Sequence, residues 1–534
     1  MSQPFAAASA AALAALDRDR VLSRLWDRDH TVWREDPTEI ANRLGWLDLP
    51  QTMRDHLPEL DEVARETRDE NVQDVVLCGM GGSSLGAEVL RAVAGRGPGF
   101  PRLFVVDSTV PDWVRRVRSM IDPARSLFLI SSKSGGTAEV SSLFRYFWAE
   151  TFAAVGPREA GQRFLAITDP GSSLATLAGE RGFRHLFLNP PDVGGRFSVL
   201  SLFGLVPAAL LGLDLRQLLA RAGAMAVACG PELAAEKNPG AALGVAMAAG
   251  AQTGRPFLTL LADSRLAPFG LWAEQLVAES LGKEGVGVVP ICGEPLRDAD
   301  SYPDDRVFVR LRLAGERELE LDRLAAALAN DGRPVIEIAL PAPEALGAEF
   351  FRWEYATAVA GHLLGVHPFD QPNVEETKRE TRKLLDTFRT AGALPGVTAP
   401  DDLRAMLLAS PAPTYVALLV YTDETDSDTA LLQEIRWRIG RELGVPTTLG
   451  FGPRYLHSTG QMHKGGPDGG LFVQIVGLGD DLEIPGEPFG FATLARAQAD
   501  GDLLALQGRG RRCVRLELGD DVAYRLAAIH QSLD

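Results

Sequence analysis

Apolar side chains are spaced differently before and after residue 75. Residues 1–70 are rich in alanine, leucine and charged residues and contain no β-branched runs, which predicts a helical N-terminal segment. Short continuous apolar runs separated by amphipathic stretches follow. Five of these runs resemble buried strands, at 75–79, 103–107, 126–132, 163–169 and 185–189. Such alternation of buried strands with helices is typical of a parallel sheet covered on both faces.

The same alternation starts again twice further along the chain. After an alanine-rich helical stretch at 200–250, strands are expected at 255–263, 286–292, 306–313 and 333–340. A proline-containing break at 392–400 precedes three more expected strands, at 414–422, 471–477 and 513–518. We therefore predict an α/β protein in four parts: helical segment 1–70, α/β domains 71–230 and 231–395, and a C-terminal α/β segment 396–534.

Composition narrows the possible partners and compartment. The net charge of −17 disfavours nucleic-acid binding, because phosphate backbones require a basic surface. The longest uncharged stretch, 197–213, is too short to cross a membrane. The N-terminus lacks the basic start of a signal peptide, and we interpret it as a helix. The four cysteines form no CxxC pair, so we expect a cytoplasmic protein without a thiolate metal site.

Two polar turns follow predicted strands and precede predicted helices. The first is GMGGSSLG at 79–86, with Gly82 and Ser83; the second is SSKSGGTAE at 131–139, with Ser132, Lys133, Ser134 and Thr137. Either turn alone could be an ordinary capped connection. Together they predict a phosphate site at the carboxyl edge of one sheet, where helix N-termini favour anions. Neither has the spacing of a dinucleotide-binding or nucleoside-triphosphate-binding loop.

Four other segments carry candidate catalytic groups. They are GGRFS at 194–198 with Arg196, the helix at 271–285 with Gln275 and Glu279 four residues apart, the proline-rich 367–380 with Lys378, and the glycine-rich 452–470 with His457 and His463. Taken singly, each has a plain alternative: a surface arginine, a solvated glutamate, an exposed lysine or a structural histidine. Lysine is nevertheless rare, with six against 48 arginines, and a lysine can lose its proton. We expect no metal, because no carboxylate or cysteine pair completes the two histidines.

In this order, the segments resemble those of the phosphoglucose isomerase family between about residues 75 and 385. The resemblance implies two sugar-isomerase (SIS) domains. It also implies interconversion of glucose 6-phosphate and fructose 6-phosphate through an enediolate, with no cofactor. The helical N-terminus and PRYLHSTGQMHKGGP resemble the isomerase half of bifunctional transaldolase/phosphoglucose isomerase proteins. A homodimer is expected from the resemblance alone.

The resemblance also implies a role for each matching residue. Glu279 would move the proton between C1 and C2, Arg196 would stabilise the enediolate oxygen, and Lys378 would assist ring opening. The sugar phosphate would be held by Ser83, Ser132, Ser134 and Thr137, with Lys133 beside it, and the sugar would be lined by Gly82, Glu139 and Gln275.

One departure concerns the histidine that opens the sugar ring. In the family a Gly-Gln-His stretch shortly after the base supplies it, but this chain has no histidine between Glu279 and His362. Either His463 or His457 is a candidate replacement. The remaining alternatives are ring opening by Lys378 and water, or a substrate that is already open.

Two other functions compete with this interpretation. The substrate could be another 6-anionic sugar such as mannose 6-phosphate, because phosphate turns do not recognise the configuration at C2. A non-catalytic SIS sensor would keep the serine turns and lose the base, and the presence of Glu279, Arg196 and Lys378 together argues against it.

Overall fold

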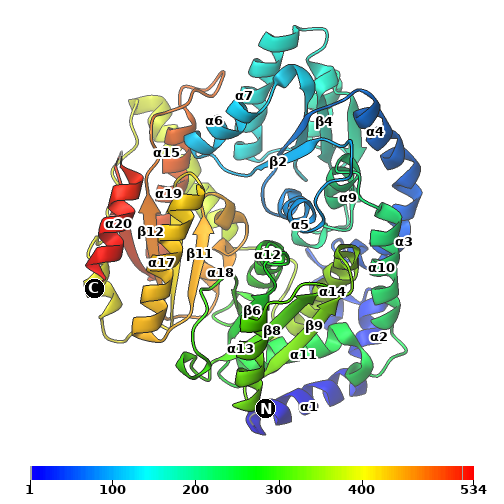
Figure 1. The fold of residues 1–534 in the computed structure, drawn as a ribbon, viewed down its shortest axis with the longest axis vertical. Helices are drawn as coiled ribbons and strands as arrows, with labels where there is room; N and C mark the ends of the chain where they lie inside the picture. Colours follow the sequence, from blue (N-terminus) through cyan, green and yellow to red (C-terminus); the bar gives the residue numbers. More distant parts are fainter. Residues whose placement is uncertain (1–2, 520, 534) are drawn as a thin grey trace.

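Three parallel sheets organise the molecule, which is described by a computed structural model over residues 3–519 and 521–533. Figure 1 shows the first sheet region in cyan, the second in green and the third in orange, with the N-terminal helices in blue along one side. Helix α12 (Phe269–Leu281) lies between them, in contact with helices of both other regions. This arrangement confirms the predicted α/β class with helix-flanked parallel sheets.

The first sheet has the strand order β2-β1-β3-β4-β5, and all five strands predicted for it are present. The strands are β1 (Asp74–Cys78), β2 (Arg102–Val106), β3 (Ser126–Ser131), β4 (Phe164–Thr168) and β5 (His185–Leu188). The helices between them are α5 (Leu85–Ala94), α6 (Pro111–Met120), α7 (Ala138–Val155) and α8 (Ser173–Arg181). Since β1, β3 and β4 are buried along their whole length, apolar side chains occupy both of their faces.

The second sheet has the order β7-β6-β8-β9 and lies beside a bundle of long helices. Its strands are β6 (Phe257–Ala262), β7 (Val289–Ile291), β8 (Arg306–Leu313) and β9 (Val335–Leu340). The helices of this part of the chain are α9 (Leu202–Leu210), α10 (Leu215–Ala228), α11 (Pro239–Gln252), α13 (Leu319–Asn330), α14 (Leu346–Leu364) and α15 (Val374–Ala391). Of these, α9 packs on α4 (Leu57–Asp69) and α5 of the preceding segments, and α15 packs on α19 (Phe491–Gly508) of the C-terminal segment. Helix α14 packs on both α10 and α11 and is apolar for most of its circumference, as expected of a buried helix.

The N-terminal segment forms α1 (Gln3–Arg18), α2 (Val21–Trp26), α3 (Leu49–Thr52) and α4 (Leu57–Asp69). Its apolar residues belong to the same core as one face of each of the first two sheets. Leu16, Leu77 and Val309, for example, are all members of that core. One core therefore extends across residues 70 and 230. The domain boundaries placed at these two residues stay predictions.

The C-terminal segment forms the third sheet, with the order β11-β10-β12-β13. Its strands are β10 (Tyr415–Tyr421), β11 (Thr447–Phe451), β12 (Gly470–Val476) and β13 (Arg512–Glu517), and its helices are α16 (Leu403–Leu407), α17 (Asp426–Leu443), α18 (Gly460–Gly465), α19 (Phe491–Gly508) and α20 (Val522–Ser532). Strand β11 was not predicted. Fully buried Arg436 binds this sheet to the second domain by donating hydrogen bonds to the carbonyls of Cys292 and Gly293.

Among the described residues, no helix combines the length and apolar character needed to cross a bilayer.

Candidate functional site

The turn after β1 packs directly against the predicted arginine loop. Gly81 has a φ of +55°, which favours glycine. A Cβ atom on Gly82 would lie 1.9 Å from the carbonyl oxygen of Gly195. Glycine is therefore required at position 82 for the turn and the Arg196 loop to meet.

The second polar turn lies beside the first at the carboxyl edge of the sheet. The Ser131 hydroxyl donates to the carbonyl of Ser83 at 2.8 Å and joins the two turns. Within the second turn, the hydroxyls of Ser132 and Thr137 are 3.2 Å apart, and the amide of Gly135 donates to Ser132 Oγ. Thr137 is the N-cap residue of the 18-residue helix α7. Hydroxyls and amide groups at a helix N-terminus make this turn suitable for an anion.

The other two predicted phosphate ligands differ in their surroundings. Ser134 is exposed, and its Oγ accepts a hydrogen bond from the amide of Gly136. Lys133 Nζ lies 2.6 Å from Asp169 Oδ2 and also donates to the carbonyl of Pro191. Burial raises the pKa of Asp169, although Lys133 opposes that rise. Lys133 thus lies at the turn, as predicted, but is already engaged by a carboxyl group.

The predicted base and arginine are in contact at the centre of the molecule. Arg196 Nη1 lies 3.1 Å from Glu279 Oε1, and each side chain is about 5% exposed. Gln275, one helical turn earlier on α12, donates from Nε2 to Glu279 Oε2 at 3.0 Å. Arg196 Nε donates to Ser280 Oγ at 2.7 Å. The carboxylate is therefore fixed on both oxygens, in a setting from which bulk water is largely excluded.

The proline-rich loop is held beside this pair by two cations. Arg196 donates to the carbonyls of Pro368 and Asp370 at 2.8 Å. Lys283 donates to the carbonyls of His367 and Asp370 at 2.6 Å and forms an ion pair with the Asp370 side chain. Burial lowers the pKa of Lys283 to about 7, assisted by the charge of Arg196 and opposed by Asp370. Lys283 therefore helps to hold the proline-rich loop in place.

His457 enters the site from the C-terminal segment of the same chain. Its Nε2 lies 2.9 Å from Glu139 Oε1, and its backbone carbonyl accepts a hydrogen bond from Gln275 Nε2 at 2.8 Å. Burial tends to raise the pKa of Glu139, but the nearby charges, His457 first and then Lys378, outweigh it and lower the pKa. One amide side chain thus connects the loop of His457 with the carboxylate of Glu279.

Two predicted catalytic residues are not brought into contact with this group. Lys378 is 43% exposed and forms an ion pair with Glu375 at 2.8 Å, although its charge still acts on Glu139. His463 is 1% exposed and packs against the rings of Tyr455 and Phe472, in an apolar core that the third sheet shares with β6, β7 and α12. Burial lowers the pKa of His463 well below its ordinary value, and its ring nitrogens have no hydrogen-bond partner among the described residues. The structure therefore separates the two candidate histidines and leaves His463 outside the site, because its helix α18 directs it into an apolar core.

Sequence reasoning missed three residues that hold the site together. Gln498 on α19 donates to Glu139 at 2.7 Å, and Asp107 forms a bidentate ion pair with Arg454, three residues before His457. The position of Asp107 at the end of a predicted strand was a usable signal. Gln498 lies in a helix with no motif, so no sequence signal could have revealed it.

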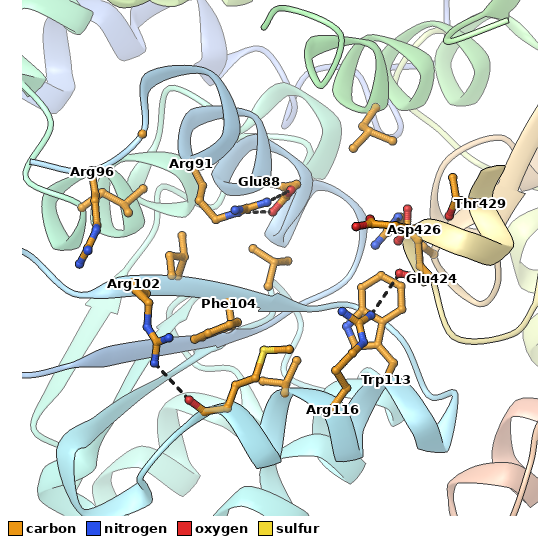
Figure 2. A pocket seen from close by; sticks show the side chains of 18 residues that line it. Glu88, Arg91, Arg96, Arg102, Phe104, Trp113, Arg116, Glu424, Asp426 and Thr429 are labelled. Carbon is orange, nitrogen blue, oxygen red and sulfur yellow. Dashed lines mark hydrogen bonds and ion pairs between the residues drawn. The ribbon is translucent and has the colours of Figure 1, made fainter. Parts of the chain in front are cut away.

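A large cavity lies outside this group of residues. It measures about 720 Å³ and is located between edge strand β2, helices α5 and α6 and the start of α17. Figure 2 shows Arg96 and Arg102 at one end, and Glu424, Asp426 and Trp113 at the other. Its arginines are largely paired within the fold: Arg91 with Glu88, Arg102 with Asp74 and Arg116 with Asp423.

No group of three histidine, cysteine, aspartate or glutamate side chains in the described part of the chain is arranged to hold a metal ion.

These features define an α/β protein in which two polar turns at one sheet edge lie beside a buried carboxylate and arginine and a partly exposed histidine. A sequence model of the family described as phosphoglucose isomerase matches residues 49–287. Glucose-6-phosphate isomerase from Rubrobacter xylanophilus is 34% identical over 393 residues, which are 64% of this chain and 89% of the relative. Glucose-6-phosphate isomerase from Symbiobacterium thermophilum is 30% identical over 67% of this chain and 90% of the relative. The chain belongs to the phosphoglucose isomerase family.

Solved structures agree with this assignment at the level of the fold. A hypothetical protein from Thermus thermophilus is 28% identical with a TM-score of 0.61, and the match covers 73% of this chain and 98% of that protein. A glucose-6-phosphate isomerase from Chlamydia trachomatis has a TM-score of 0.59 at 18% identity, and the match covers 71% of this chain and 86% of the other.

Proposed function

We propose that this chain interconverts glucose 6-phosphate and fructose 6-phosphate. The observation that carries the proposal is the position of Gln275, which binds both the carboxylate of Glu279 and the backbone of His457. Aldose–ketose exchange requires a base for the carbon-bound proton and an acid for the ring oxygen. Gln275 Nε2 links the carboxylate of Glu279 to the backbone of the turn that carries His457, while the His457 imidazole contacts Glu139 at the start of α7.

The phosphate would be bound first, by the turn at 131–137. Ser132 and Thr137 present hydroxyls at the start of α7, and Ser134 is exposed to an incoming ligand. Lys133 would add positive charge if the phosphate drew it away from Asp169. Ser83 and Gly82 on the neighbouring turn would border the same anion.

His457 is the better of the two histidines for opening the sugar ring. Its side chain is 18% exposed and is oriented by Glu139, whereas His463 is enclosed by aromatic rings. Ring opening breaks the bond between C1 and the ring oxygen. The histidine can give a proton to the ring oxygen, and its imidazole can then take the proton that the C1 hydroxyl loses as the carbonyl forms. Lys378, exposed at the edge of the site, stays a prediction for this step.

Glu279 would then carry the proton between the two carbons. Its carboxylate would remove the proton from C2 of the open-chain aldose and return it to C1, while a proton moves from the oxygen on C2 to the oxygen on C1. Negative charge develops on the enediolate oxygen, and Arg196 provides a planar cation 3.1 Å from the base to stabilise it. The side-chain oxygen of Gln275 is buried without a partner among the described residues, so it is available to a sugar hydroxyl.

Turnover of fructose 6-phosphate by wild type and Glu279→Gln tests the proposal. Glutamine keeps the shape of the side chain and cannot take the proton, so we expect kcat to fall about 10³-fold. Binding of glucitol 6-phosphate, an open-chain polyol phosphate, should change little. Glu349→Gln, a buried carboxyl on α14 outside the site, is the matched control and should keep full activity.

Other outcomes would select the alternatives. A wild-type protein that binds glucitol 6-phosphate without turnover would point to a non-catalytic sugar-phosphate sensor. Turnover of mannose 6-phosphate in preference to glucose 6-phosphate would move the substrate to another 6-phosphosugar. A Glu279→Gln variant with nearly normal kcat would refute the assignment of the base.

A cytoplasmic location is part of the proposal, supported by four cysteines that are all free thiols. The homodimer expected from the family is also a proposal.

A further inference from the structure

The turn that carries His457 has a second side chain directed at the first domain. Residues Arg454–His457 form a 3₁₀ turn, η11, after β11. Side chains three residues apart on a 3₁₀ helix lie on the same face. Arg454 and His457 therefore project together, and Arg454 reaches Asp107 after β2 while His457 reaches Glu139 at the start of α7. These two contacts align η11 along the carboxyl edge of the first sheet.

The contact between Arg454 and Asp107 has the geometry of a rigid clamp. Nε and Nη2 of Arg454 each lie 2.9 Å from one carboxylate oxygen of Asp107. Asp107 is 1% exposed and Arg454 is about 13% exposed, so solvent screens the pair little. A bidentate pair of this kind fixes orientation as well as distance. Tyr455, the next residue, is held from the other side, because its hydroxyl donates to Asp502 at 2.8 Å.

Further contacts hold the guanidinium group from behind. Arg454 Nη1 lies 3.0 Å from Glu424 Oε2, and the guanidinium carbon is 4.9 Å from the centre of the Trp113 ring. Arg454 lines the 720 Å³ cavity described above, and Figure 2 shows Glu424 and Trp113 at the end of this cavity opposite Arg96 and Arg102. Asp107 Oδ2 also lies 3.5 Å from the hydroxyl of Ser84, within the first polar turn. The clamp therefore connects the His457 turn with both the edge strand and the polar turn.

We propose that Arg454, clamped by Asp107, is a positioning residue that sets the place of His457 at the sugar ring. This inference rests on the proposed isomerase function. Arg454 lies on η11 and does not contact Glu279 or Arg196, so its effect on catalysis passes through η11. Asp107 also contacts Ser84 of the first polar turn, and the decisive comparison is therefore made with Arg454. A catalytic group displaced by about 1 Å can lose on the order of 10²-fold in rate.

The test is a double-mutant cycle between Arg454→Lys and His457→Ala. Lysine keeps the positive charge but cannot form the two-pronged contact. We expect Arg454→Lys to lower kcat for glucose 6-phosphate by about 10- to 100-fold, with binding of glucitol 6-phosphate within about twofold of wild type. In a His457→Ala background the same substitution should lower kcat by less than about twofold, because there is no histidine left to misplace.

A matched control separates positioning from general loosening of the domain contact. Arg115 donates to the carbonyls of Asp480 and Asp481 across the same boundary between the first domain and the C-terminal segment, and neither acceptor belongs to the Arg454 clamp. Arg115→Lys should leave kcat unchanged. Asp107→Asn removes the charge from the other half of the clamp and should reproduce the loss seen with Arg454→Lys. If Arg454→Lys fails to fold, the activity of Asp107→Asn tests the proposal instead.

Two results would overturn the inference. One is full activity of both clamp variants. The other is an Arg454→Lys loss that is equally large with and without His457, which would indicate a purely structural effect. In either case wild-type turnover and its loss in Glu279→Gln would still stand, so failure of the clamp and failure of the isomerase function can be told apart.

Discussion

Glu349 on α14 offers a sharp test of how burial controls ionisation in this fold. Its side chain is about 5% exposed, with Oε1 3.3 Å from Arg352 and Oε2 without a partner among the described residues. Burial raises the pKa from its ordinary value of 4.5 to about 7, although the charge of Arg352 opposes the rise. Glu349→Gln removes the titration and preserves the shape of the side chain.

The sign of the effect follows from proton binding. Between pH 4.5 and about 7 the folded state keeps the proton that the unfolded chain has lost, so the free energy of unfolding of wild type falls as pH rises through this range. Each pKa unit corresponds to about 1.4 kcal/mol, and the full penalty above pH 7 is therefore roughly 3 kcal/mol. Below the ordinary pKa both states carry a neutral carboxyl group and the penalty disappears.

Urea denaturation at about pH 4.5 and about pH 8 measures this difference. We expect wild type and Glu349→Gln to be similar in the acidic buffer, and the variant to be more stable by about 2–3 kcal/mol in the alkaline one. A gap between the two proteins that is the same at both pH values would refute the reasoning. It would mean that Arg352 or bound water keeps the carboxylate charged at little cost.

Two further predictions concern the polar turns. Gly82→Ala places a Cβ atom 1.9 Å from the carbonyl oxygen of Gly195, and it should lower the free energy of unfolding by about 1–3 kcal/mol in urea titrations. Gly179→Ala is the control, because its Cβ atom meets nothing within 4 Å and should not destabilise the protein. Equal stability of these two variants would contradict the close packing of the turn on the arginine loop. Ser132→Ala should raise the KM for fructose 6-phosphate about tenfold by removing a hydroxyl from the proposed phosphate turn, and Ser141→Ala, at an exposed position on the helix α7 that follows this turn, is the control. An unchanged KM in steady-state assays would place the phosphate elsewhere.

The strands of the first domain could be predicted because burial on both faces leaves a direct trace in the sequence. Val75, Val76 and Leu77 face two different cores, so no polar residue interrupts the run. Strand β11 has the sequence TTLGF and is only partly buried, and it therefore gave no comparable signal. Polar residues at strand ends predicted two turns that the structure brings together, through the hydrogen bond from Ser131 to Ser83, and the phosphate role of Ser132 stays a prediction.

The choice between His457 and His463 could not be made from sequence. Both lie within seven residues of each other in a glycine-rich stretch, and no local pattern distinguishes them. What separates them is tertiary contact: η11 directs His457 toward the first sheet, and the apolar core between the second and third sheets encloses His463. Contacts over 318 residues, such as that between His457 and Glu139, leave no trace in local periodicity.

His457 reaches Glu139 from within a single polypeptide, and this has a kinetic consequence. A group delivered by a separate subunit is lost when the subunits dissociate, so the rate per chain would fall on dilution. A group tethered to the same chain has an effective concentration fixed by the connecting structure, whatever the number of molecules in solution. Dilution that separates associated chains should therefore leave His457 in place at Glu139, and specific activity measured over a dilution series should not fall through loss of this group.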